Sequence, residues 1–147
     1  MTKAGAPATP RTAPPQYNAV SRPACLCGLP AAYEDCCGRH HRDKLGNPAR
    51  SAEALMRSRY SAYVLGLSDY LLATWHVRTR PVALEPSPVG LQWLGLEVRQ
   101  HRCIDQHHVE VEFVARSRLG GRARRLHEVS QFVRENGRWL YLDGQTR

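Results

Sequence analysis

Two short turn sequences in the last third of the chain constrain its fold more than any other feature. Residues 109–116 alternate apolar and polar side chains at the two-residue period of a half-buried β-strand. The dipeptides Gly120-Gly121 and Asn136-Gly137 have the composition of two-residue hairpin turns. With a further candidate strand at 94–102, they predict a four-stranded antiparallel meander.

The segment before these strands has a helical period. Apolar residues of the stretch 51–67 fall on one broad stripe, and Ser51 is a candidate N-cap. Ser68 and Asp69 offer a cap for a second, short helix, which must end before Pro81. Helices followed by an antiparallel sheet predict an α+β domain.

Counting residues back from the two turns predicts which polar side chains face the core. A two-residue turn at Gly120-Gly121 places Glu128 and Ser130 on the apolar inner face of the sheet. The same count across Asn136-Gly137 places Asp143 opposite Ser130 and diagonal to Glu128. The inner face is therefore predicted to combine aromatic side chains with two carboxylates and a hydroxyl.

Arg59 falls near the middle of the apolar helical stripe, where a buried guanidinium needs an anion. We expect it to pair with Glu128 or Asp143 across the core. In the alternative interpretation, Arg59, Glu128, Ser130 and Asp143 line a ligand pocket in which a carboxylate anchors a substrate or acts as a general base. His127 is predicted to point away from this face.

Four of the five cysteines lie in two close pairs, Cys25-x-Cys27 and Cys36-Cys37, separated by eight residues. This spacing indicates a tetrahedral metal site, with zinc as the leading metal and iron as a competitor. Because adjacent side chains tend to diverge, His40 or His41 is an alternative fourth ligand. Four thiolates leave no open position, so the site is predicted to be structural. Cys103 is expected to be a small buried apolar residue.

The cysteine pattern resembles the SEC-C zinc motif, named for the tail of the SecA translocation motor. Together with residues 54–64, 69–76 and 126–130, it resembles the YchJ-like family of small bacterial proteins. The resemblance implies a zinc-binding motif followed by a cone-shaped domain similar to nuclear transport factor 2, with helices packed on a curved antiparallel sheet. The Pro/Ala-rich composition of residues 1–23 predicts a disordered tail. After it we expect the metal-binding knuckle at 24–47 and the α+β domain at 48–147.

The chain carries a net charge of +8, and one group of basic residues stands out. Five arginines surround the Gly120-Gly121 turn without an acidic residue between them: Arg116, Arg118, Arg122, Arg124 and Arg125. Such a tip is suited to nucleic acid phosphates, or to a solvated sheet edge. Trp75 and His76, after the second helix, are candidates for the mouth of the cone, although a structural hydrogen bond at His76 is the preferred interpretation.

The sequence contains no nucleophile elbow, phosphate-binding glycine loop or dinucleotide fingerprint, so enzymatic activity has no positive support. The favoured hypothesis is a cytoplasmic, non-enzymatic zinc-binding adaptor that docks a protein partner through the knuckle. A small-molecule or enzymatic pocket in the cone, and RNA or ribosome association through the arginine tip, are the alternatives. No membrane-spanning segment is expected, and the oligomeric state is left open.

Overall fold

The computed structural model describes Gly5 and residues 22–147, so most of the predicted N-terminal tail lies outside the described residues. The chain forms a 3₁₀ turn η1 (Tyr33–Asp35), helices α1 (Cys37–Arg42), α2 (Ala52–Leu65) and α3 (Ser68–Ala73), and strands β1 (Gln92–Cys103), β2 (His108–Leu119), β3 (Arg122–Glu135) and β4 (Arg138–Thr146). The strands form one antiparallel sheet in the order β1-β2-β3-β4. This is the predicted α+β architecture.

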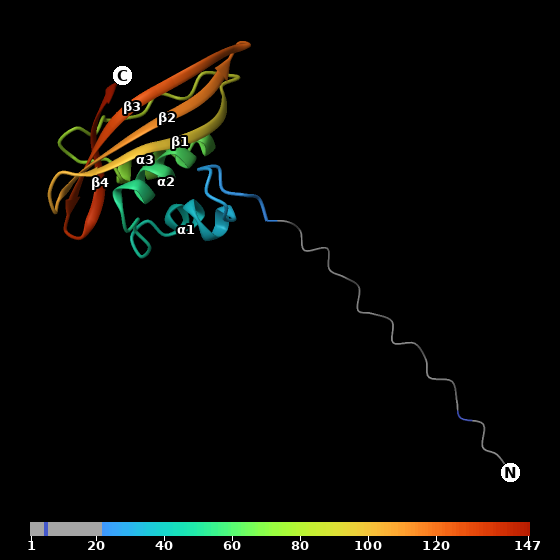
Figure 1. The fold of residues 1–147 in the computed structure, drawn as a ribbon, viewed down its shortest axis with the longest axis horizontal. Coiled ribbons are helices and arrows are strands. Elements are labelled where there is room, and N and C mark those ends of the chain that lie inside the picture. Colours follow the sequence, from blue (N-terminus) through green and yellow to red (C-terminus); the bar gives the residue numbers. More distant parts are fainter. Residues whose placement is uncertain (1–4, 6–21) are drawn as a thin grey trace.

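The helices cover one face of a curved sheet, and the cysteine-containing segment packs on the far side of the helices (Figure 1). Side chains of α2 meet the inner faces of β2 and β3 in a single core, which contains Leu55, Met56, Val111, Phe113 and Phe132. In the described part of the chain, no helix has both the length and the apolar character that crossing a membrane requires. The fold therefore places α2 between two layers, the sheet and the cysteine segment.

Local sequence signals set the ends of α2. The Ser51 hydroxyl accepts a hydrogen bond from the backbone N–H of Ala54 at 3.0 Å, which confirms the predicted N-cap. The helix ends at Leu65, two residues earlier than expected, because Gly66 adopts a left-handed conformation with φ of 70°. The predicted Ser68 cap is wrong, since α3 begins at Ser68 itself and has no side-chain cap.

Regular structure also begins earlier than expected. Ahead of the first helix expected from the sequence, which starts after Ser51, α1 runs from Cys37 through Arg42 and packs against α2. His40 is buried and its Nδ1 lies 2.6 Å from the carbonyl oxygen of Asn47. A six-residue helix without apolar periodicity is held by such tertiary contacts, which the sequence does not display.

Both predicted hairpin turns are present. Gly120, Gly121, Asn136 and Gly137 all have positive φ, between 50° and 76°, as the two-residue hairpin turn requires. The predicted pairing of β2 with β3 is confirmed, and Glu128 lies opposite Phe113.

The pairing of β3 with β4 follows the prediction only near the turn. Tyr141 pairs with Phe132, as the residue count from the Asn136-Gly137 turn requires, but a bulge between Gln131 and Phe132 then shifts the register by one residue. Asp143 consequently lies opposite Gln131, and Gly144 takes the place opposite Ser130. The prediction that Asp143 shares the inner face with Glu128 is therefore wrong.

The bulge coincides with two other contacts. Beyond α3, the chain pairs with β4 through hydrogen bonds from His76 N to Tyr141 O and from Tyr141 N to Thr74 O, each 2.8 Å. On the opposite side of β4, the Glu128 carboxylate occupies the space in which a Cβ at position 144 would lie. Gly144 thus lets the Glu128 carboxylate lie against the backbone of β4.

Candidate functional sites

The four clustered cysteines converge in the segment before α2. The backbone turns back between Cys25 and Ala31, with a 2.8 Å hydrogen bond from Cys25 N to Ala31 O, and Gly28 takes a positive φ of 89° in this turn. Cys36 lies in a non-helical conformation between η1 and α1, which directs its thiol and that of Cys37 to the same side. The expected divergence of these adjacent side chains does not occur.

The thiols are spaced as ligands of one ion. The four sulfur atoms all lie within 4.8 Å of one another, and the Cys27 and Cys36 sulfurs are 3.6 Å apart. Zinc bonded to sulfur at about 2.3 Å in a tetrahedron separates neighbouring sulfurs by about 3.8 Å. Cys25, Cys27 and Cys37 are buried and Cys36 is half-buried, so the cluster is largely shielded from water. Its geometry fits a metal ion.

The electrostatics of the cluster favour a cation. A hydrogen bond from the Cys37 thiol lowers the pKa of Cys27 to about 5, because it stabilises the Cys27 thiolate. Burial raises the pKa of Cys36 to about 12, and the hydrogen bond to Cys27 raises the pKa of Cys37. Without a cation, a second thiolate next to that of Cys27 is unfavourable because the site is buried and already negatively charged. A bound divalent ion would stabilise all the thiolates.

The two alternative histidine ligands have other partners. His41 donates from Nε2 to the carbonyl oxygen of Ser58 at 2.8 Å and accepts at Nδ1 from the Tyr33 hydroxyl at 2.6 Å, and burial lowers the pKa of His41. His40 is directed toward Asn47, as described above. Neither joins the cysteine group. The histidines thus hold the knuckle in place, a role that their sequence positions did not indicate.

The cysteine segment is joined to α2 by a further contact. Arg57 of α2 donates from Nη1 to the carbonyl oxygen of Cys27 at 2.7 Å, and Cys27 is fully buried. The ring of His41 also packs edge-on against Tyr70 of α3, with the ring centres 4.7 Å apart. The knuckle is therefore a layer of the fold rather than a separate appendage.

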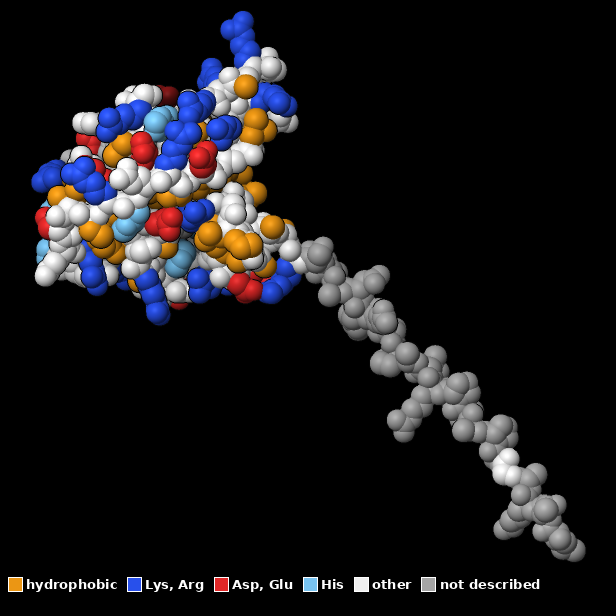
Figure 2. Space-filling model, viewed as in Figure 1, with side chains coloured by type: hydrophobic (Ala, Val, Ile, Leu, Met, Phe, Trp, Pro, Cys, Tyr) orange, Lys and Arg blue, Asp and Glu red, His pale blue; other side chains and the backbone are white. Residues whose placement is uncertain are grey.

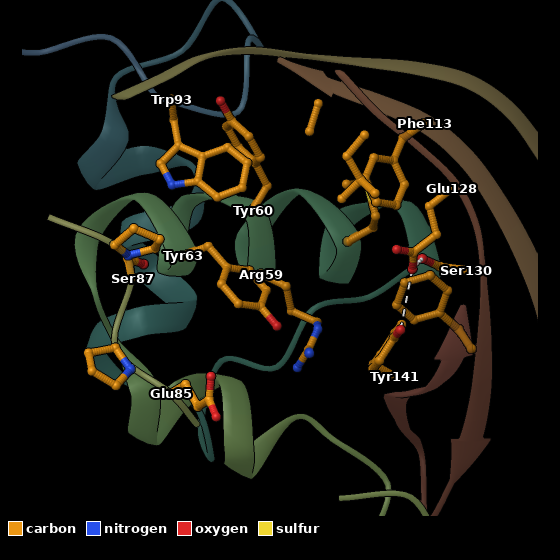
Figure 3. Close-up of a pocket in the computed structure, with 16 residues that line it drawn as sticks. Arg59, Tyr60, Tyr63, Glu85, Ser87, Trp93, Phe113, Glu128, Ser130 and Tyr141 are labelled. Atoms are coloured by element: carbon orange, nitrogen blue, oxygen red, sulfur yellow. Dashed lines mark hydrogen bonds between the residues drawn. The ribbon is translucent and has the colours of Figure 1, made fainter. Parts of the chain in front are cut away.

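A cavity of about 410 Å³ lies between α2, the sheet and the loop that precedes β1 (Figure 3). Arg59, Glu128 and Ser130 line it, as the pocket interpretation expected, whereas Asp143 is exposed outside it. The walls are largely aromatic and include Tyr60, Tyr63, Trp93, Phe113 and Tyr141. Glu85 and Ser87 at the mouth come from a proline-rich loop that carries no binding motif, so sequence analysis did not single them out. A ligand for this cavity stays a prediction.

The predicted ion pair across the core does not form. Arg59 donates from Nη1 to the carbonyl oxygen of Leu71 and to the Thr74 hydroxyl, each at 2.7 Å. Among the described residues, no carboxylate oxygen lies within 4.0 Å of the Arg59 guanidinium nitrogens, the limit for an ion pair. The backbone of α3 therefore takes the place of the expected anion.

Glu128 has neutral partners. Its Oε1 accepts from the Ser130 hydroxyl at 2.7 Å and from the Tyr141 hydroxyl at 3.3 Å. Burial raises the pKa of Tyr141 above its ordinary value, so this phenol remains a proton donor. The carboxylate is thus held in one orientation at the end of the cavity.

Three residues flagged by the sequence lie away from the cavity. His76 lies 2.7 Å from Glu135 and accepts from the backbone N–H of Arg78, which confirms its structural role. His127 points to the outer face of the sheet, toward Glu112 at 3.1 Å. Cys103 is exposed on β1, so the prediction that it is buried is wrong.

The five arginines of the β2–β3 tip are all exposed, and Lys and Arg side chains gather where this hairpin projects from the sheet (Figure 2). Strand alternation divides them between the two faces: Arg122 and Arg124 share the inner face with Leu126, and the others lie on the outer face. Arg116 pairs with Glu97 at 3.5 Å. Contact between this tip and nucleic acid stays a prediction.

Comparison with known proteins gives a consistent set of relatives. Residues 51–144 match the family described as "YchJ, middle NTF2-like domain". A UPF0225 protein of Methylibium petroleiphilum is 64% identical over 121 residues, covering 82% of this chain and 87% of the relative. A UPF0225 protein of Bordetella pertussis is 55% identical over 88% of this chain and 98% of its own length.

Two solved structures share the fold. The solution structure of a SEC-C motif containing protein from Rhodopseudomonas palustris has a TM-score of 0.65 and 34% identity, and the match covers 84% of this chain and 98% of that one. The crystal structure of a SEC-C motif containing protein from Psychrobacter arcticus has a TM-score of 0.67 and 31% identity, over 91% of this chain and 79% of that one.

Proposed function

The chain belongs to the UPF0225 family with the YchJ middle NTF2-like domain, and from this premise we propose that it is a non-enzymatic accessory protein organised by one zinc ion. The convergence of four thiol sulfurs within 4.8 Å carries the proposal. Cys25, Cys27, Cys36 and Cys37 would fill a tetrahedral shell and leave no position for water or substrate. The ion would supply structure, fixing the knuckle against α2.

The proposed role of the knuckle is to dock a protein partner. Leu26 and Leu29 lie in the turn between the ligand pairs, and they are 41% and 40% exposed. Hydrophobic side chains gather on this part of the surface, near the point where the continuously described chain begins (Figure 2). Arg39 on α1 is exposed as well. An exposed apolar tip suits a partner surface that is apolar.

Thiol labelling tests the metal site. We expect protein purified without added metal to contain one equivalent of zinc, and a thiol reagent to modify only the exposed Cys103 until a chelator is added. After chelation all five cysteines should react, and the Cys103→Ser variant should show no adduct before chelation and four after it. Modification of the four clustered cysteines at the same rate with and without chelator would contradict the proposal.

A second pair of variants tests the docking role. Leu26→Ser with Leu29→Ser removes the apolar tip and leaves all four thiols, and Leu45→Ser is the matched control because Leu45 is 69% exposed outside the turn. We expect the tip variant to keep its zinc and to lose the protein partners captured by crosslinking, whereas the control keeps both. Unchanged capture of the same partners by the tip variant would refute docking through the knuckle.

A second candidate function is small-molecule binding in the cavity. Its volume of about 410 Å³ lies within the range of ligand pockets, and Arg59 lines it with an exposed fraction of only 5%. This function does not depend on a protein partner. The two functions are compatible, because α2 presents Arg57 to the knuckle and Arg59 to the cavity.

A further inference from the structure

Arg59 retains unused hydrogen-bonding capacity although it is buried. Both of its hydrogen bonds to the described residues start from Nη1, so the three N–H groups on Nε and Nη2 have no partner there. The guanidinium carbon lies over the rings of both Trp75 and Tyr141, 5.0 and 4.5 Å from their centres. These contacts fix its position without neutralising its charge. The cavity therefore contains a preorganised cation.

Glu128 supplies a second polar point in the same cavity. Oε1 accepts from Ser130 and Tyr141, whereas Oε2 accepts from no described residue. Figure 3 shows Tyr141 beside Glu128, with Arg59 projecting from the helix toward the same end of the cavity. The Tyr141 side chain contacts both groups, because its ring lies under the Arg59 guanidinium and its hydroxyl donates to Glu128. This end of the cavity, its floor, thus has the Arg59 guanidinium as an anion site and the Glu128 carboxylate as a hydrogen-bond acceptor, with Tyr141 in contact with both.

The remaining walls are apolar. Met56, Tyr60, Trp93 and Phe113 enclose the space between the polar floor and the mouth. A hydrated inorganic anion such as phosphate would leave these walls unfilled and place its charge near Glu128. An apolar body of aromatic size would fill them, since flat rings pack well against aromatic walls.

We propose that the cavity binds an organic acid of aromatic size: its carboxylate pairs with the free N–H groups of Arg59, its ring packs among Tyr60, Trp93 and Phe113, and a hydroxyl or amine donates to Glu128. This inference rests on the second function proposed above. Arg122 and Arg124, on the same face of the hairpin tip, favour the approach of an anion, whereas Glu85 at the mouth opposes it.

Three probe compounds test the ligand class on the full, metal-loaded chain. They are 2-hydroxy-3-phenylpropionate, which carries its carboxylate and hydroxyl at the same end of the molecule, its uncharged amide, and 3-phenylpropionate without the hydroxyl. Affinities are measured by titration calorimetry, with the Trp93 indole signal in NMR spectra reporting the location. We expect the hydroxy acid to bind about ten- to hundredfold more tightly than its amide, because the acid alone can form charged hydrogen bonds with Arg59. Phenylpropionate should bind less tightly than the hydroxy acid.

The titrations separate two claims: that the cavity binds small molecules, and that it prefers an organic acid. If none of the three compounds shifts the Trp93 signal at millimolar concentration, small-molecule binding in this cavity is wrong. If acid and amide bind equally, the cavity binds ligands but the organic-acid inference is wrong. The wild-type comparison decides this without any variant.

Variants then test which residue causes the preference for the acid over the amide. Arg59→Gln should abolish the preference for acid over amide, and Glu128→Gln should reduce the preference for the hydroxylated acid. Arg78→Gln is the matched control, since Arg78 is exposed and does not line the cavity. A preference for the acid that survives in folded Arg59→Gln protein would overturn the assignment to Arg59.

Discussion

Replacing Arg57 by leucine tests whether the knuckle and α2 form one structural unit. The change removes the 2.7 Å hydrogen bond from Nη1 to the Cys27 carbonyl oxygen, and leucine still covers part of the buried side-chain stem. It also removes the ion pair with Glu53 at 3.6 Å, but this is an i,i+4 helix pair whose carboxylate is exposed, and such pairs contribute about 0.3–0.5 kcal/mol. A buried hydrogen bond from a charged donor contributes about 1.5–3 kcal/mol.

That free energy corresponds to about a ten- to hundredfold loss of metal affinity if the knuckle docks only when the ion is bound. If the knuckle is already docked without metal, the loss appears instead as a lower free energy of unfolding of the metal-free protein. The two contributions should add to about 1.5–3 kcal/mol.

Both quantities can be measured on the same samples. Competition with a chromophoric chelator gives the metal affinity, and urea unfolding of the metal-free protein gives the stability. Glu53→Gln is the control, because it removes the ion pair and keeps the hydrogen bond to Cys27; we expect it to resemble the wild type. If Arg57→Leu changes both quantities no more than Glu53→Gln does, the contact does not couple the two layers.

Three further results are expected. Metal binding at neutral pH should release at least two protons, because the pKa of Cys36 is raised to about 12 and the pKa of Cys37 is also raised. Metal affinity should therefore increase with pH. Calorimetry in buffers of different ionisation enthalpy counts the released protons, and release of none would contradict the prediction. Gly66→Ala should lower the free energy of unfolding by about 1–2 kcal/mol in urea titrations, since φ is 70° there and no steric clash is added; an unchanged stability would mean that the cap relaxes. Glu128→Leu should lower the free energy of unfolding by about 1–3 kcal/mol, because it leaves the buried Ser130 hydroxyl without its acceptor. Adding Ser130→Ala in the same chain should recover most of this loss. If the second change recovers nothing, the loss comes from a partner of Glu128 other than Ser130.

The cysteine site was predictable because its residues are close in sequence. Four cysteines within thirteen residues can meet without long-range folding, and the spacing alone indicates a metal ligand set. The contacts that hold the knuckle were not predictable in this way. Arg57, His41 and Tyr33 act through backbone carbonyls and rings on other elements, and nothing in their local sequence distinguishes them from surface residues.

By itself, the sequence determined the strands, both hairpin turns and the β2–β3 register, because alternation and turn conformation are properties of neighbouring residues. It also placed Arg59 and Glu128 facing the same space. Only the tertiary structure decided their partners. The bulge at Gln131–Phe132 moved Asp143 off the inner face, and carbonyl and hydroxyl groups of the α3 region replaced the expected carboxylate at Arg59. Backbone groups are the same in every residue, so no sequence pattern shows which of them will accept a buried charge.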